Sequence, residues 1–413
     1  MTALLIAGSL FAVADDPLPA PEALPVQEKM PDPLVGLDGR KVASKEAWFA
    51  KRRPELKRLF EHYMYGRFPA PRPVSGNVLF EVRAALGGKA VVAEIELTVE
   101  GAAAAPFRML LVLPANKPKA PVFLGLNFCG NHAVLDDERI AIPSVWMYDR
   151  QPGVEKNRAS AAGRGKAKET WPVDMILEAG FGLATIYGGE IEPDVKDERG
   201  GLYKYIPAVG APDEQWGRIA VWAWGLSRAV DYLSTRPDVD SRRIAAVGHS
   251  RMGKTALLVG AFDERIALIV SNQSGCGGAA PSRGTVGESV ERINTAFPAW
   301  FCGNFKKFNK DPQRLPFDQN GLVALCAPRP VLFTNAEEDT WANPHGQFDV
   351  LKAADPVYRF LDAGFLDAKE YPPHFALPVG TLGYFVHPGK HSMTRDDWRC
   401  YLSFAAANLE KSR

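Results

Sequence analysis

Apolar runs of strand length alternate with helical patterns along most of the chain. Continuous apolar runs occupy residues 121–128, 181–187, 243–249, 266–274, 330–338 and 383–387. Helical spacing lies between them, at 173–180, 217–235 and 254–262, and a closing helix is predicted over about 394–409. Strands that are apolar throughout and alternate with helices are typical of a parallel sheet covered on both faces. The pattern therefore predicts one α/β domain without internal repeats.

The N-terminal part has a different pattern. Residues 15–40 are rich in Pro and Asp and lack periodicity, which indicates an arm or linker on the surface. Folded structure is predicted to start near Ser44, which caps a helical segment that ends before Pro69. Two runs with alternating polarity follow, at 91–101 and 107–114, and they predict antiparallel strands at one edge of the sheet. We therefore place the main domain at 41–413.

Two long stretches are not simple connections. Residues 129–170 are polar and basic, and residues 277–320 hold Gly, Pro and many aromatic residues without a clear period. Long insertions in a compact domain are usually functional loops or disordered segments. We interpret both as walls of a binding cleft.

The first residues are predicted to be a targeting segment. An apolar run of about eleven residues ends in Ala12-Val13-Ala14, a small-x-small pattern that precedes two acidic residues. This pattern is typical of a secretory signal peptide, residues 1–14, although Lys or Arg is missing near its start; a short buried helix is the alternative. The sequence therefore predicts a secreted or periplasmic protein without a membrane span.

Composition narrows the classes of function and cofactor. The 413 residues include 49 Lys and Arg against 48 Asp and Glu, a formal net charge of +1. This balance argues against nucleic acid as a partner, and we expect a small or neutral substrate and a monomeric protein. Five cysteines without CxxC spacing argue against a zinc site and against a disulfide scaffold, although one or two bridges remain open. No metal or organic cofactor is expected.

A serine between glycines is the clearest chemical signal. Residues 248–253, GHSRMG, resemble the pattern G-x-S-x-G with one more residue before the second glycine, and they lie after a predicted strand and before a predicted helix. A sharp turn at this place strains the serine backbone and lifts its Oγ above the sheet, and the glycines allow the close approach. Gly and Ser also form ordinary turns. The context favours Ser250 as a nucleophile.

A serine nucleophile needs a base and an acid, which in this architecture follow it in the order acid, then histidine. We choose His391, because the last strand should end at His387 and the base belongs in the loop beyond it. The strand at 330–338 leads into Glu337, Glu338 and Asp339. Asp339 is our choice because it begins the loop, and Glu338 is the alternative. The alternative for the three acids is that they are solvated charges of the loop. The alternative for His391 is that it only packs or caps at the entry of the last helix.

These motifs give the chain a family resemblance. GHSRMGKTAL at 248–257 resembles the nucleophile region of the glucuronoyl esterases, carbohydrate esterase family 15, which are α/β-hydrolases. Further similar segments extend from about residue 30 to the end, among them YGGEIEPD at 187–194, GESVERIN at 287–294, APRPVLFTNAEEDTWANP at 327–344 and HPGKHSMTRDDW at 387–398. The resemblance implies a three-layer αβα sandwich with a mostly parallel central sheet.

The resemblance also implies roles for individual residues. It gives Ser250, His391 and Asp339 as the triad, and Arg251 as a donor to the carbonyl oxygen of the ester. A guanidinium fixed there would stabilise the charge that grows on the tetrahedral intermediate. The residues implied as sugar contacts are Lys254, Glu288 and Trp341. A plain core role remains the alternative for Trp341.

One residue departs from the fungal pattern. Gln273 stands where fungal-type members carry the glutamate of the triad, and an amide cannot stabilise an imidazolium as a carboxylate does. The resemblance thus predicts a bacterial-type serine esterase that relies on Asp339 and hydrolyses glucuronoyl or 4-O-methyl-glucuronoyl esters, as in lignin-glucuronoxylan linkages. The alternatives are an acetylxylan or other carbohydrate esterase and a catalytically weak glucuronoxylan-binding protein.

Overall fold

A nine-stranded sheet forms the centre of the computed structural model, which describes residues 17–409. The strand order is β1-β2-β3-β7-β4-β8-β9-β10-β11. The strands from β7 to β11 run parallel, and β1, β2 and β3 add antiparallel pairs at one edge. Their bounds are β1 Val74–Ala84, β2 Ala90–Val99, β3 Phe107–Pro114, β4 Ala120–Asn127, β7 Gly182–Tyr187, β8 Val239–His249, β9 Ile266–Asn272, β10 Val331–Ala336 and β11 Leu382–His387. The predicted mostly parallel sheet with antiparallel N-terminal edge strands is confirmed.

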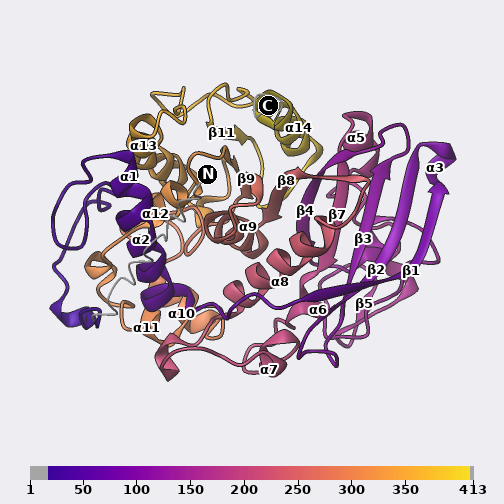
Figure 1. The fold of residues 1–413 in the computed structure, drawn as a ribbon, viewed down its shortest axis with the longest axis horizontal. Coiled ribbons are helices and arrows are strands. Elements are labelled where there is room, and N and C mark those ends of the chain that lie inside the picture. Colours follow the sequence, from indigo (N-terminus) through magenta and orange to yellow (C-terminus); the bar gives the residue numbers. More distant parts are fainter. Residues whose placement is uncertain (1–16, 410–413) are drawn as a thin grey trace, which may run out of the picture.

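Helices cover both faces of this sheet. Alternate strand residues belong to two separate buried clusters, for example Ala246 in one and Val247 in the other. Helices α8 (Arg218–Leu233), α9 (Arg251–Phe262), α12 (Gln319–Cys326) and α13 (Pro344–Phe360) pack in the first cluster. Helices α5 (Val173–Glu178) and α14 (Arg395–Leu409) pack in the second. This is the three-layer αβα arrangement that the sequence predicted. The antiparallel strands form one end of the molecule, and α12 and α13 lie toward the other (Figure 1).

The N-terminal helix begins where the sequence predicted it. The Oγ of Ser44 accepts a hydrogen bond from the Ala47 N–H, and helical backbone continues through α1 (Lys45–Ala47), η2 (Trp48–Arg52), α2 (Arg53–Phe60) and η3 (Glu61–Tyr65). Gly66 ends the segment with φ +85°. The preceding arm lies against the domain, where Arg283 donates to the Gln27 carbonyl and Asn320 donates to the Pro31 carbonyl. The proposed signal peptide lies outside the described residues.

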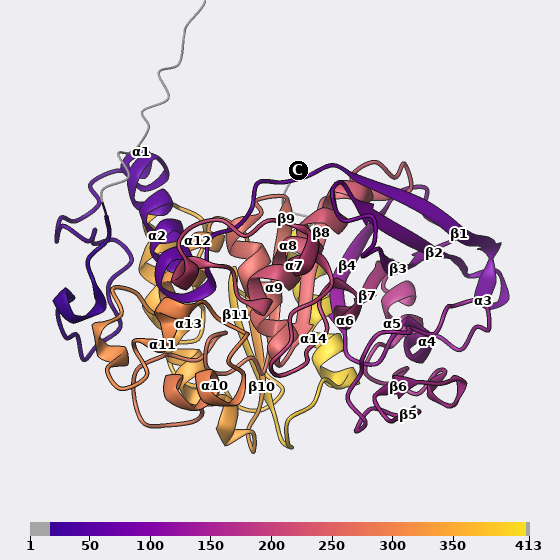
Figure 2. The same ribbon diagram turned by 90° about the horizontal axis from the view of Figure 1, so that it is seen from below.

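The two insertions lie along one side of the molecule. Figure 2 shows β5 (Val154–Glu155) and β6 (Arg158–Ala159) of the first insertion on the same side as α10 (Val290–Ala296) of the second, with β10 between them. The remaining short elements are η1 Pro21–Ala23, α3 Ala85–Gly88, α4 Asn131–Val134, η4 Ala161–Gly163, α6 Gly188–Ile191, α7 Leu202–Tyr205, η5 Pro212–Glu214, α11 Gly303–Lys306, η6 Pro312–Arg314 and η7 Thr340–Ala342. Both insertions therefore stand where they can border the ends of central strands.

The structure also bears on the state of the cysteines and on membrane-spanning helices. All five cysteines are free and buried, so the one or two bridges left open by the sequence do not form. Within residues 17–409, no helix is long and apolar enough to cross a membrane.

Candidate functional site

Ser250 occupies the turn between β8 and α9. Its backbone has φ +57° and ψ −128°, a conformation that non-glycine residues rarely adopt. The Ser250 N–H donates to the Asn272 carbonyl at 2.9 Å, which ties the turn to the end of β9. A Cβ on Gly248 would lie 2.0 Å from the Met252 carbonyl oxygen, so only glycine fits there. This strained strand-to-helix turn is the geometry of a nucleophile elbow.

Asp339 and His391 meet beside this turn, at the carboxyl ends of β10 and β11. The Nδ1 of His391 lies 2.6 Å from the Oδ2 of Asp339. A carboxylate only accepts hydrogen bonds, so Nδ1 carries the proton and Nε2 keeps its lone pair. The Asp339 side chain is 6% exposed and that of His391 is 44% exposed. The imidazole is thus held in the tautomer of a general base by a buried acid.

The alternative residues lie elsewhere. Glu338 is exposed, and its backbone N–H donates to the Gly389 carbonyl. His387 is buried and faces Asp397 in the interior, with its Nε2 3.2 Å from Oδ2. His345 and His374 lie near Glu337 on the surface. The acid and the histidine that the sequence analysis chose, Asp339 and His391, are thus hydrogen-bonded to each other.

Gln273 holds the loop that carries His391. Its Nε2 donates to the Ser392 carbonyl at 2.7 Å, and its Oε1 accepts from the Ser392 N–H at 2.9 Å. Gln273 directly follows the last residue of β9 and has φ +45°. Gln273 therefore fixes the backbone beside His391 rather than the imidazole ring.

Arg251 follows the serine and lies in a cage of aromatic rings. Its guanidinium carbon is 4.5 Å from the Phe128 ring centroid, 5.2 Å from that of Tyr148 and 6.0 Å from that of Trp300. The side chain is 10% exposed. Burial lowers the pKa of Arg251, and the charge of Asp194 opposes this shift. Tyr148 and Trp300 come from the two insertions, which supports their interpretation as walls of a cleft.

Asp194 organises this cage, and the sequence analysis missed its role. Its Oδ2 lies 3.1 Å from the Arg251 Nε, and its Oδ1 accepts from Arg218 at 2.9 Å and from the Trp300 indole at 2.8 Å. The Tyr148 hydroxyl donates to the Asp194 carbonyl oxygen at 3.2 Å. Within the described chain, no hydrogen bond to protein satisfies the buried Nε of Arg251. This nitrogen is buried against Asp194, so the guanidinium is positioned by the charge of the carboxylate and by the surrounding rings.

Lys254 is buried one turn into α9. Its Nζ donates to the Ser274 carbonyl and, at 2.6 Å, to the Cys276 carbonyl. Burial lowers the pKa of Lys254, while the charge of Glu288 opposes the shift. The charges of Lys254 and Glu288 act on each other, so the two side chains lie near one another.

Glu288 and Trp341 lie together at the surface. The Glu288 N–H donates to the Trp341 carbonyl at 3.1 Å. Burial raises the pKa of the Glu288 carboxyl, against the charges of Lys254 and Arg292 and a side-chain hydrogen bond with Trp341. Trp341 is 52% exposed, which excludes the core role left open by the sequence. Arg292 lies 5.5 Å from its ring centroid. An exposed indole beside a half-buried carboxyl suits contact with a sugar ring.

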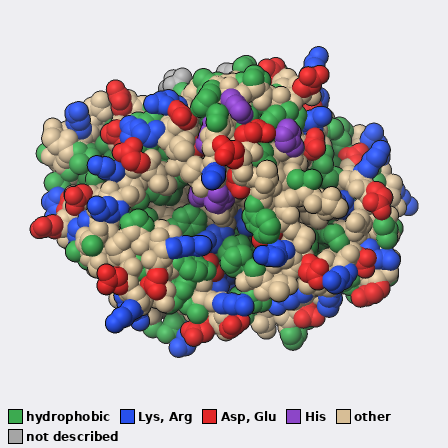
Figure 3. Space-filling model, turned by 180° about the vertical axis from the view of Figure 1, so that it is seen from behind, with side chains coloured by type: hydrophobic (Ala, Val, Ile, Leu, Met, Phe, Trp, Pro, Cys, Tyr) green, Lys and Arg blue, Asp and Glu red, His purple; other side chains and the backbone are tan. Residues whose placement is uncertain are grey.

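The surface reflects this arrangement. Figure 3 shows a face that is hollowed near its middle, where histidine, basic and hydrophobic side chains gather. A separate groove of about 1030 Å³ lies beside α5 and includes Trp171, Asp174 and Arg395 in its walls. None of the candidate residues lines it, and its Arg395 is already paired with Asp174. Residues 17–409 contain no cluster of three or more side chains suited to hold a metal ion.

Comparison with known proteins finds similar esterases. The family model described as glucuronyl esterase, fungi, matches residues 200–362. Carbohydrate esterase MZ0003 from an unknown prokaryotic organism is 46% identical over 386 residues, which cover 91% of this chain and 88% of that protein. A solved promiscuous CE15 esterase from a marine bacterial metagenome has a TM-score of 0.87 at 44% identity, and covers 94% of this chain and 98% of its own. The glucuronoyl esterase from Solibacter usitatus has a TM-score of 0.83 at 38% identity, with 94% and 99% covered.

Proposed function

This chain belongs to carbohydrate esterase family 15, the glucuronoyl esterases, and from that premise we propose that it hydrolyses esters of glucuronic or 4-O-methylglucuronic acid. It is a carboxylic ester hydrolase with an α/β-hydrolase fold. The proposed natural substrate is the ester that joins lignin alcohols to glucuronoxylan. The observation that carries the proposal is the buried Asp339 carboxylate 2.6 Å from His391, beside a serine on a strained turn.

In the proposed mechanism, Ser250 is the nucleophile. The Nε2 of His391 takes the hydroxyl proton as Oγ attacks the ester carbonyl carbon, and Asp339 stabilises the imidazolium that forms. The tetrahedral intermediate then expels the alcohol, which receives the proton from His391. Water, deprotonated by the same imidazole, attacks the acyl-enzyme and releases the uronic acid and free Ser250.

The oxyanion is assigned to Arg251 and to the start of α9. N–H groups in the first turn of a helix lack intrahelical acceptors, so the Arg251 N–H is available there. The guanidinium adds a positive charge in a largely buried cage, where it stabilises developing negative charge more than a neutral ester.

The acyl pocket is assigned to Lys254, Glu288 and Trp341. Lys254 has one ammonium donor beyond the two that bind backbone carbonyls, and Glu288 accepts from sugar hydroxyls. The exposed Trp341 indole supplies an apolar face. An acetyl group needs none of these contacts, which favours a uronic acyl group over acetylxylan. We also propose that the protein acts as a secreted or periplasmic monomer.

Initial rates on three samples test this function. A benzyl ester of 4-O-methylglucuronic acid is given to the wild type and to Ser250→Ala, and an acetylated xylan oligosaccharide is given to the wild type. We expect turnover of the uronic ester only with Ser250 present. Acetate release alone would make the protein an acetyl esterase. Binding to glucuronoxylan without turnover of any ester would make it a binding protein.

A further inference from the structure

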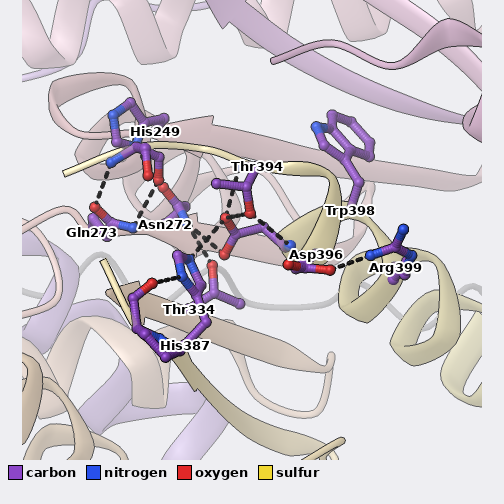
Figure 4. A network of polar contacts seen from close by, with 12 residues as sticks. His249, Asn272, Gln273, Thr334, His387, Thr394, Asp396, Trp398 and Arg399 are labelled. Atoms are coloured by element: carbon purple, nitrogen blue, oxygen red, sulfur yellow. Dashed lines mark hydrogen bonds and ion pairs between the residues drawn. The ribbon is translucent and has the colours of Figure 1, made fainter. Parts of the chain in front are cut away.

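Both ends of the His391 loop, residues 388–394, are joined to one buried carboxylate. The Oδ2 of Asp397 accepts from the Thr394 N–H at 2.8 Å and from the Thr394 hydroxyl at 2.9 Å, at the end of the loop. The same oxygen lies 3.2 Å from Nε2 of His387, where the loop begins. Asp397 is fully buried in the first turn of α14. Figure 4 shows its partners His387, Thr394 and Asn272 within one network of polar contacts. A single side chain therefore sets the span of the loop.

The other oxygen of Asp397 is linked to the His391 ring through Asn272 and His249. Oδ1 accepts from the Asn272 Nδ2 at 3.1 Å, and Nδ2 also donates to the Thr334 hydroxyl at 2.7 Å. The amide oxygen of Asn272 thus faces His249 and accepts from its Nδ1. The His249 ring packs on the His391 ring, with centroids 4.4 Å apart. Burial and the neighbouring His391 lower the pKa of His249 to about 3, so this supporting ring is neutral.

The hydrogen bonds of His387 require it to be charged. Its Nδ1 lies 2.7 Å from the Pro388 carbonyl oxygen, and its Nε2 faces the Asp397 carboxylate. Both partners only accept, so both nitrogens carry protons. Burial lowers the pKa of His387, but the hydrogen bond and charge of Asp397, the Pro388 carbonyl and the charge of Asp396 outweigh it and raise the pKa overall. The other titratable groups facing Asp397 are Cys400 and Tyr401 of α14, both neutral because burial raises their pKa values.

We propose that Asp397 is a positioning residue for the base His391, and that it acts through a charged His387 at one end of the loop and Thr394 at the other. The proposal rests on the assignment of His391 as the base. If His387 loses its proton, one of its nitrogens presents a lone pair to an acceptor oxygen. The start of the loop is then released, and the imidazole of His391 loses its alignment with Ser250. Activity therefore falls as pH rises through the pKa of His387.

The test uses the rate at which a fluorophosphonate labels Ser250, measured against pH beside kcat and KM for an ester. Misplacement of a reacting group by about 1 Å costs roughly 100-fold, so Asp397→Asn should lower both the labelling rate and kcat by about 10- to 100-fold, with KM unchanged. His387→Gln keeps a donor for Asp397 but does not titrate, and should lose the alkaline decline of the wild type. His374→Gln is the matched control, because His374 is an exposed histidine beside Glu337, and should follow the wild type at every pH.

Three results would overturn the proposal: wild-type labelling by Asp397→Asn, an unchanged alkaline decline in His387→Gln, or a wild type without that decline. If Asp397→Asn fails to fold, His387→Gln decides. The reagent carries no sugar, so labelling reports on the positioning of His391 even if uronic esters prove not to be substrates. Failure of the proposed function and failure of this inference are therefore distinguishable.

Discussion

Replacing Asp339 by asparagine removes the charge behind His391 and keeps the shape of the side chain. Two unit charges about 4 Å apart attract by about 4 kcal/mol at an effective dielectric constant of about 20 and by about 1 kcal/mol in water. The Asp339 side chain is 6% exposed, but the imidazole is 44% exposed, so the interaction lies between these limits. Since each 1.36 kcal/mol is tenfold in rate, the charge alone is worth about 5- to 1000-fold in kcat.

Loss of the tautomer adds to this effect. The asparagine can turn its N–H₂ toward Nδ1, which moves the imidazole proton to Nε2 and blocks proton abstraction from Ser250. We therefore expect kcat of Asp339→Asn to fall by about 100- to 1000-fold, with KM little changed, in initial-rate assays on the uronic benzyl ester. Glu338→Gln is the control, because Glu338 is an exposed acid next in sequence. Asp339→Asn activity within about threefold of the wild type, or an equal loss in Glu338→Gln, would refute this reasoning.

Four other outcomes are expected. Arg251→Met should lower kcat by about 100-fold with KM unchanged on the same ester, since the donor acts in the transition state, and a loss confined to KM would contradict this. Trp341→Ala should raise KM by about tenfold, or about 1.4 kcal/mol, with the Tm unchanged because the ring is exposed; a large fall in Tm would point to packing instead. The folded-state pKa of His387 is raised above its unfolded value of about 6.5, so its stabilisation is complete below about pH 6.5 and is lost as pH rises through the folded pKa. The gap in Tm between the wild type and His387→Gln should close over that window in differential scanning fluorimetry, and a constant gap would disagree. The five buried thiols should react with an aqueous thiol reagent only after unfolding, because burial raises the pKa of Cys129, Cys276 and Cys302 to about 12; a thiol that reacts in the native protein would contradict their burial.

Much of the fold was predictable because most central strands are apolar on both faces. Besides the short elements of the insertions and loops, three longer elements, β1, α12 and α13, escaped prediction for physical reasons. Strand β1 lies at the sheet edge, and its exposed and half-buried residues leave no apolar run. Helix α12 is buried on every side and therefore has no polar stripe, and α13 contains Pro356. Periodicity marks an element when its two sides differ, whereas the buried central strands were recognised by their unbroken apolar runs.

Some residues of the candidate site were predictable from the sequence, and others were not. Ser250, Asp339 and His391 follow strands of one parallel sheet, whose carboxyl ends meet at one edge, so their order in the chain predicted their meeting. Asp194 lies in a polar loop, and its partner Trp300 is 106 residues away, so no local pattern marks it. Thr394 and Asp397 form a capping box in the structure, since the Asp397 N–H donates to the Thr394 hydroxyl and the Thr394 N–H donates to the Asp397 carboxylate. This spacing is local, although the sequence analysis did not use it. The contact of Asp397 with Asn272, 125 residues away, is not visible in the sequence.

Covalent capture at Ser250 tests the central claim most directly. The wild type is mixed with the benzyl ester of 4-O-methylglucuronic acid, quenched in acid during turnover and digested, and the peptide containing Ser250 is examined by mass spectrometry. The account predicts one uronoyl group on Ser250, absent from the Ser250→Ala digest. Turnover without that adduct, or an adduct on another residue, would contradict it.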